Sequence, residues 1–199
     1  ELLEQYSEGL IVSSACLGGE ISRKIDDGKI EEAEEAVQWY KSVFGEDYYI
    51  ELQRHKTDRP DADQTTYPKQ ERVNKELIRI ARKYDVKLIA SNDVHFVNEE
   101  DADAHDRLIC LSTGKDFDDP NRMRYSKQEW LKTTAEMNQI FADIPEALSN
   151  TLEVAEKVEF YTIDHSALMP FYPIDPSFGT EEKYKEKYSK EALIEEFGE

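Results

Sequence analysis

Two residues that can bind a metal ion stand two positions apart in the segment Ser-Asn-Asp-Val-His-Phe at residues 91–96. In an extended segment, side chains two positions apart project from the same side, so Asp93 and His95 could reach one ion together. A carboxylate oxygen with an imidazole nitrogen suits Zn²⁺, Mn²⁺ or Fe²⁺. An Asp–His hydrogen bond that merely closes a strand explains the same pair, and the spacing leaves both interpretations open.

Three further residues are candidates for the same site. Cys16 follows an apolar run, where a cysteine is either a ligand or a small buried side chain. His55 follows a second apolar and aromatic run, whereas His105 lies in a helical stretch in which a local hydrogen bond is the simpler explanation. The sequence contains no Walker or GxGxxG phosphate loop and no Gly-x-Ser-x-Gly elbow, so no catalytic residue beyond a metal site is predicted.

The elements that must position these residues alternate along the first half of the chain. Short apolar or aromatic runs predict strands over residues 9–15, 48–52 and 86–90. Apolar residues three and four positions apart predict helices over residues 29–44 and 69–84. Strands joined by such helices indicate a parallel sheet or barrel, with its site at the carboxyl ends of the strands.

The second half of the chain is predicted to be mainly helical. Helices are expected over residues 102–113 and 134–158, with Pro145 in the first turn of the last helix. The proline-rich stretch 171–176 predicts a linker, and a final amphipathic helix is expected over residues 181–197.

Composition sets limits on the function. The 199 residues suit one domain or slightly more, and 25 Lys+Arg against 44 Asp+Glu give a net charge of -19. Such acidity argues against a protein that coats DNA without sequence preference. Residues 54–87 reverse the balance with ten basic and six acidic residues. A solvated helix face explains this stretch, although such a face could also approach a phosphate backbone.

Localisation and redox state follow from what the sequence lacks. No run of about 18 apolar residues and no signal peptide are present, so we expect a soluble, cytoplasmic protein without a membrane partner. Only Cys16 and Cys110 occur, and a disulfide scaffold is not expected. The first residue is Glu1, which suggests a piece of a longer chain.

Three segments in order carry a resemblance to a known family: Ser-Ser-Ala-Cys-Leu-Gly-Gly-Glu at 13–20, Tyr-Ile-Glu-Leu-Gln-Arg-His at 49–55 and Ala-Ser-Asn-Asp-Val-His-Phe at 90–96. They resemble the polymerase and histidinol phosphatase (PHP) domain of bacterial replicative DNA polymerase III alpha subunits of the DnaE type. Residues 104–110, 118–125 and 141–151 are similar to the same family. The resemblance covers essentially the whole chain.

The resemblance implies an α/β fold and a metal site. Residues 1–115 would form the later part of a distorted β/α (PHP) barrel, residues 116–168 its helical remainder, and residues 169–199 a linker and the start of the polymerase palm. Cys16, Asp93 and His95 match metal ligands of the family, whereas His55 and His105 match positions beside the site. The family's opening His-x-His and its further ligands have no counterpart here, so we expect an incomplete site for Zn, Mn, Fe or Mg ions.

The implied function is that of a replicase segment. The parent subunit would synthesise DNA on a template, using template-primer DNA, deoxynucleoside triphosphates and other replisome subunits. Its PHP domain would hydrolyse DNA 3′ ends with bound metals, and the segment alone is expected to be inactive. Two alternatives stay open: a non-catalytic structural or docking module of the replicase, and a separate PHP-type phosphoesterase acting on small phosphates.

Overall fold

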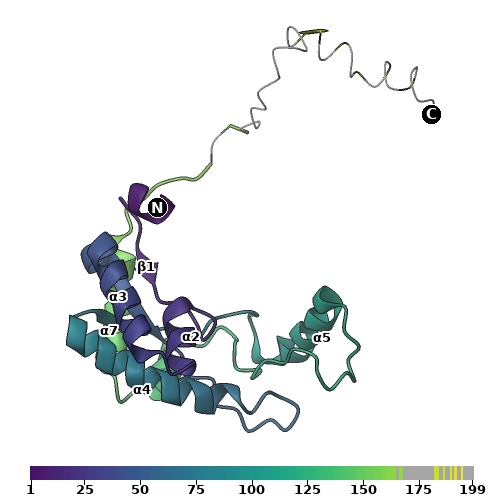
Figure 1. Cartoon of the computed structure of the whole chain (residues 1–199). Helices are drawn as coiled ribbons and strands as arrows, with labels where there is room; N and C mark the ends of the chain where they lie inside the picture. Colours follow the sequence, from purple (N-terminus) through teal and green to yellow (C-terminus); the bar gives the residue numbers. More distant parts are fainter. Residues whose placement is uncertain are drawn as a thin grey trace. The chain divides into compact units, whose positions relative to one another are not determined.

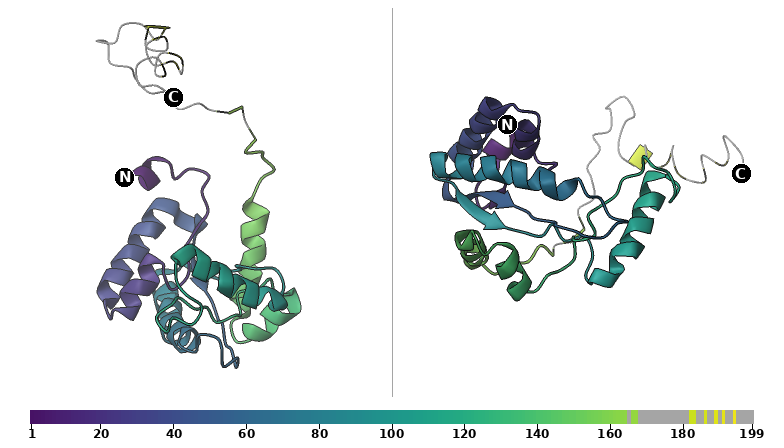
Figure 2. Two further views of the ribbon diagram at one scale, coloured as in Figure 1. Left: turned by 90° about the vertical axis from the view of Figure 1, so that its right-hand side faces the viewer. Right: turned by 90° about the horizontal axis from the view of Figure 1, so that it is seen from below.

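The computed structural model describes residues 1–164, 166 and 167 and the single positions 182, 183, 186, 189, 191 and 194. The chain divides into two compact units, Glu1–Glu159 and Phe160–Glu199. The first unit carries the elements of Figures 1 and 2: α1 (Leu2–Gln5), β1 (Val12–Ser13), α2 (Glu20–Asp26), α3 (Ile30–Phe44), η1 (Gly45–Asp47), β2 (Tyr48–Leu52), α4 (Thr66–Tyr84), β3 (Lys87–Ala90), η2 (Glu99–Asp101), α5 (Ala102–Thr113), α6 (Thr134–Ile140) and α7 (Pro145–Lys157).

The three strands form a parallel sheet in the order β1-β2-β3. In the right panel of Figure 2 the strands lie between α3 and α4 on one side and α6 and α7 on the other. This arrangement confirms the α/β class and the parallel sheet expected from the alternating strands and helices. The strands within the described residues make an open sheet, and the barrel itself is not seen there.

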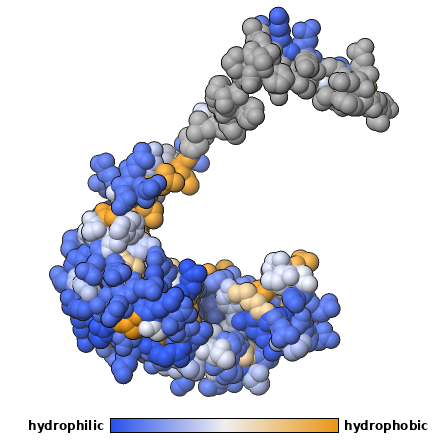
Figure 3. Space-filling view, viewed as in Figure 1, coloured by the Kyte–Doolittle hydropathy of each residue, from blue (hydrophilic) through white to orange (hydrophobic). Residues whose placement is uncertain are grey.

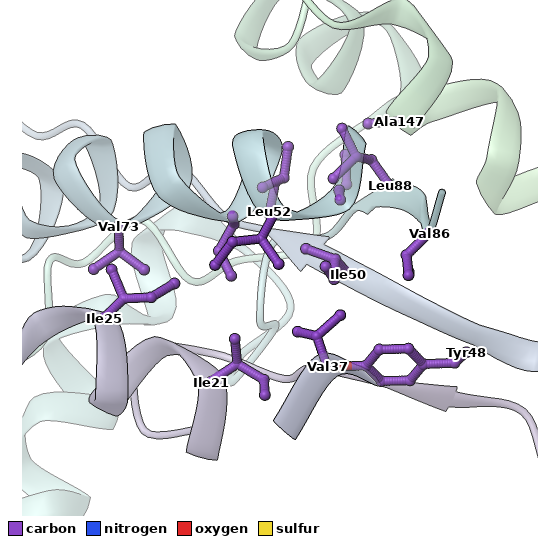
Figure 4. Packing of buried hydrophobic residues seen from close by; sticks show 14 of the residues in the cluster. Ile21, Ile25, Val37, Tyr48, Ile50, Leu52, Val73, Val86, Leu88 and Ala147 are labelled. Atoms are coloured by element: carbon purple, nitrogen blue, oxygen red, sulfur yellow. The ribbon is translucent and has the colours of Figure 1, made fainter. Parts of the chain in front are cut away.

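A hydrophobic cluster holds the helices on the sheet (Figure 4). Ile50 and Leu52 of β2 are fully buried and pack with Val37 of α3 and with Val73 and Leu77 of α4. Burial of each such side chain contributes about 1.5–3 kcal/mol before the entropy cost of ordering it. The apolar residues that recur three and four positions apart in α3 and α4 therefore face the sheet.

Helix α7 covers the edge of the sheet at β3. The Asn150 side-chain amide donates to the carbonyl oxygen of Leu88 at 2.8 Å, and the Tyr49 hydroxyl donates to Glu153 at 2.8 Å. The Lys87 ammonium donates to the same carboxylate at 2.7 Å. The Asn150 amide thus satisfies one backbone carbonyl of the edge strand, and Glu153 ties α7 to side chains of β2 and β3.

Several elements differ from the sequence-based expectations. Strand β1 spans two residues rather than 9–15, and the chain turns at Ala15, whose φ is 60°. Helix α2 was not predicted, because seven residues with only Ile21 and Ile25 as apolar positions give little periodicity. Helix α4 begins three residues early, because the Asp63 carboxylate accepts the backbone N–H of Thr66 at 2.9 Å.

Helix α1 and the short helices η1 and η2 were not predicted either, and the stretch expected to be helical over 134–158 is interrupted at residues 141–144. The other elements were predicted within one or two residues. Strand β2 and helix α5 have the expected bounds, α3 begins one residue later, and Pro145 is the first residue of α7. The predicted linker at 171–176 lies outside the described residues, as do most of the helix at 181–197 and of the palm segment 169–199. In the described part of the chain, no helix is long and apolar enough to cross a membrane.

The basic stretch 54–87 is largely neutralised by acids. Asp26 of α2 pairs with Lys69 and Arg72, and Glu34 of α3 pairs with Arg79 and Lys83. The same holds for Arg54, Arg59 and Lys87, which pair with Asp143, Asp61 and Glu153 respectively. These pairs support the interpretation of the stretch as a solvated helix face.

Candidate functional site

The loop after β1 presents Cys16 at the carboxyl end of that strand. Its tight turn requires Gly19, because a Cβ atom there would lie 2.3 Å from the carbonyl oxygen of Ser14. The N–H of Gly18 points at the Cys16 sulfur at 3.4 Å. Gly19 therefore lets the chain turn closely after Cys16, whose side chain is half-buried.

Glu51, near the end of the middle strand, links all three strand ends. Its carboxylate accepts hydrogen bonds from the hydroxyls of Ser13, at 2.6 Å, and of Ser91. The side-chain amide of Gln53 donates to it at 2.7 Å. Sequence analysis did not single out Glu51, since its role depends on partners 38 and 40 residues away.

His55 is buried, with 3% of its surface exposed, and both ring nitrogens have partners. Nε2 lies 3.1 Å from the carbonyl oxygen of Asn92, and the Gln70 amide nitrogen lies 3.0 Å from Nδ1. These partners assign a neutral ring that donates from Nε2 and accepts at Nδ1. Burial lowers the pKa of His55, in keeping with a neutral ring. His55 thus holds the loop after β3 and has no nitrogen left for a metal.

Asp93 adopts a left-handed conformation with φ of 44°, so the segment is not extended there. The geometric premise that Asp93 and His95 project from one side is therefore wrong, although their role as ligands stays a prediction. The Asn92 side chain fixes the turn by donating to the carbonyl oxygens of Gln128 at 2.8 Å and Trp130 at 2.7 Å.

A pocket of about 270 Å³ opens at the strand ends and contains part of the predicted site. Cys16, Asp93 and His55 line it, whereas His95 and His105 do not. The remaining lining residues come from three loops and the first turns of α4: Leu17, Gly18, Gln53, Thr66, Gln70, Met123, Arg124, Tyr125 and Glu129.

Tyr125 connects the pocket to the two remaining histidines. Its ring centroid lies 4.8 Å from that of His95 and 5.2 Å from that of His105, and the two imidazoles are 5.5 Å apart. Burial raises the pKa of the Tyr125 phenol, and the charges of Asp93, Glu129 and Cys16 add to the rise. The raised pKa keeps the phenol protonated at neutral pH.

Glu129 is the buried acid of the pocket, with 2% of its surface exposed. Its carboxylate accepts the Ser126 hydroxyl at 2.6 Å and the backbone N–H of Gln128 at 2.9 Å. One oxygen lies 3.6 Å from Nδ1 of His55. Neither Glu129 nor Tyr125 was selected by sequence reasoning, because both stand in irregular loops without periodic signals.

The donors in the described residues do not by themselves make a metal centre. Within that part of the chain, no three His, Cys, Asp or Glu side chains are placed to hold one ion. Cys16 and Asp93 share the pocket, His95 turns its Nδ1 to the carbonyl oxygen of Asp93 at 2.6 Å, and His55 is fully hydrogen-bonded. A structural zinc site usually needs four ligands and a catalytic one three.

Comparisons with known proteins show which proteins this chain is similar to. A profile described as "PHP domain" matches residues 1–55. The DNA polymerase III subunit alpha of Borreliella burgdorferi is 41% identical over 193 residues, which cover 96% of this chain and 16% of the relative. The proteins of the same name in Campylobacter jejuni and Treponema pallidum are 35% and 36% identical, cover 98% and 92% of this chain, and are themselves covered to 18% and 15%. The chain thus spans about a sixth of the length of these curated relatives.

Proposed function

Because this chain is homologous to one segment of DNA polymerase III alpha subunits and matches the PHP domain, we propose that it works as part of a replicative DNA polymerase. The parent subunit would carry out template-directed DNA synthesis in the cytoplasm. Its partners would be template-primer DNA, deoxynucleoside triphosphates and other replisome subunits. The similarity over nearly the whole chain supports this assignment.

We further propose that the strand-end pocket belongs to a site that hydrolyses the phosphodiester bond at a DNA 3′ end in the intact subunit. The observation that carries this proposal is the meeting of Cys16 and Asp93, from loops 77 positions apart, in one pocket. Cys16, Asp93 and His95 would be the share of the metal ligands contributed by this segment. Since the described donors do not complete a metal centre, the remaining ligands would have to come from elsewhere in the subunit.

The hydrolysis proposal is tested on the intact alpha subunit with Asp93→Asn. This change keeps the size of the side chain and removes its charge. We expect release of nucleotides from a labelled DNA 3′ end to fall at least tenfold, because metal ligands and general bases contribute factors of this order. Asp58→Asn is the matched control, since Asp58 is exposed and does not line the pocket. Equal rates in the wild type and Asp93→Asn would contradict the proposal.

A second candidate function is a non-catalytic module that stabilises the polymerase or docks a proofreading partner. The specific observation in its favour is His55, whose two ring nitrogens are already used by Asn92 and Gln70. The metal content of the purified subunit separates the two candidates. A structural module would keep the same metal content and polymerase rate in Asp93→Asn, whereas a hydrolytic site would lose metal.

A further inference from the structure

Arg124 stands out among the basic residues around the pocket. Its neighbours in the fold are paired: Arg122 with Asp106 at 2.5 Å and Arg59 with Asp103 at 2.9 Å. Arg124 is exposed, lines the pocket, and has no acidic partner within the described residues. In a chain with 44 acids and 25 bases, an unpaired guanidinium at a pocket rim is available to an anion from outside.

Tyr125 places a second donor beside it. Its side chain is half-buried and lines the pocket. The backbone position is fixed, because the Tyr125 carbonyl oxygen accepts the N–H of Asp63 at 3.0 Å. No hydrogen-bond partner for the phenol is found in the described part of the chain, so the hydroxyl can donate to a ligand.

The distribution of charge fixes where an anion could sit. Buried Glu129 and half-buried Asp93 line the pocket and repel an anion, whereas exposed Arg124 is the only Lys or Arg among its lining residues. An anionic group therefore belongs at the rim, and the rest of the ligand at the side chains of Leu17, Met123 and Tyr125. A volume of about 270 Å³ is near the lower end of ligand pockets, which suits one small unit such as a mononucleotide.

From these observations we propose that Arg124 and Tyr125 bind the phosphate group of a single nucleotide unit at the rim of the strand-end pocket. The choice of a nucleotide rests on the proposed function. The guanidinium supplies paired donors that match phosphate oxygens, and the phenol supplies one further hydrogen bond. The base or sugar lies against the side chains of Leu17 and Met123 and against the Tyr125 ring. Sequence reasoning assigned no role to either residue.

The test uses the whole chain, titrated with thymidine 5′-monophosphate, thymidine and inorganic phosphate while backbone NMR shifts are followed. We expect the monophosphate to bind at least tenfold more tightly than thymidine. Arg124→Gln should weaken monophosphate binding about tenfold or more, because a charge-assisted hydrogen bond is lost. Tyr125→Phe should weaken it about two- to tenfold, because a neutral hydrogen bond is lost and the ring is kept.

Arg107→Gln is the matched control, since Arg107 is also exposed but stacks over the Phe117 ring at 4.6 Å and does not line the pocket. Its binding should equal that of the wild type. The proposal is overturned if monophosphate and thymidine bind equally, if no monophosphate binding occurs, or if Arg124→Gln and Arg107→Gln behave alike. Unfolding curves for each variant verify the fold.

Two further experiments distinguish nucleotide binding from hydrolysis and identify whether the nucleotide is free or part of a strand. A short oligodeoxythymidylate that binds more tightly than the monophosphate assigns the site to a strand end, and equal binding assigns it to a free nucleotide. Either result supports the phosphate contact when Arg124→Gln weakens it. If Asp93→Asn leaves 3′-end hydrolysis unchanged, the hydrolytic function fails while the binding result stands.

Discussion

The strand-end pocket lies between two regions that are held together by different forces. The sheet layer, β1 to β3 with α2, α3, α4 and α7, is built on a continuous apolar cluster. The α5 arm, residues 91–132, contributes almost nothing to that cluster. Leu108 and Leu111 of α5 are 62% and 80% exposed, and hydrophobic residues appear at the surface of this region in Figure 3.

Polar contacts replace apolar packing in the α5 arm. Arg122 and Asp106 form a pair whose side chains are 4% and 6% exposed. The buried Lys127 ammonium binds Asp103 at 2.7 Å and Asp61 of the preceding loop at 2.5 Å. Ion pairs and hydrogen bonds are directional, so they place loops accurately but contribute less net stability than apolar burial. The comparison suggests a stable layer that carries a less stable, positioned arm.

The largest effect is expected from breaking the buried pair of the arm. Asp106→Ala leaves the Arg122 guanidinium buried without its partner, which costs about 3–5 kcal/mol. Because the arm is separate from the apolar cluster, amide hydrogen exchange should lose protection in α5 and keep it in β2. Equal loss in both elements would show that the two regions unfold as one.

The second prediction concerns the apolar cluster of the sheet layer rather than the ion pairs of the arm. Ile50→Ala removes a fully buried side chain from the cluster and should lower the free energy of unfolding by about 2–5 kcal/mol. Urea denaturation measures the loss, and hydrogen exchange should speed up in the strands and helices of the sheet layer. Val97→Ala, at a residue 63% exposed, is the control and should change stability by less than about 0.5 kcal/mol.

A smaller effect is expected on the pH dependence of stability. It concerns His55, which connects the two regions through its contact with the carbonyl oxygen of Asn92. Its folded pKa is lowered by burial, so the unfolded chain takes up the proton first as pH falls. The contribution to stability is full above the ordinary histidine pKa of about 6.5 and is lost as pH falls towards the folded pKa.

His55→Gln should therefore flatten the dependence of unfolding free energy on pH between about 7.5 and 5. His105→Gln is the comparison, since burial and then the nearby His95 also lower the pKa of His105, although its ring is more exposed. An unchanged pH dependence in His55→Gln would show that this ring is not the titrating group.

The smallest effect is expected at the surface of the sheet layer. Arg72→Gln removes an exposed pair with Asp26 and should cost less than about 1 kcal/mol. At about 1 M salt, where screening acts within about 3 Å, the difference from the wild type should vanish. A difference that persists at high salt would mean that Arg72 stabilises the protein through packing rather than charge.

The same contrast explains what the sequence could predict. Helix α3 and strand β2 were found because periodic apolar residues face the cluster. The end of β1 was missed, because an apolar run does not show where Ala15 turns the chain. Residue type singled out Cys16 and Asp93, which both line the pocket, and their role as ligands stays a prediction.

The rest of the site depends on contacts across long sequence distances. Tyr125 meets His95 and Glu51 meets Ser91 only after the chain has folded, and neither pair leaves a local pattern. The positive φ of Asp93 is likewise set by the neighbouring loop, to which Asn92 is hydrogen-bonded, rather than by its own sequence. Polar loops place side chains individually, so no periodic rule could predict them.

The most direct measurement asks whether Asp93 and Tyr125, which come from two different loops of the α5 arm, act in one site. Asp93→Asn, Tyr125→Phe and the double variant are compared in the intact alpha subunit for the rate of nucleotide release from a labelled DNA 3′ end. If the two side chains act in one pocket, we expect each single change to slow release, and the double variant to be slower by much less than the product of the two factors. Unchanged rates in both single variants, or two factors that simply multiply, would contradict a shared site.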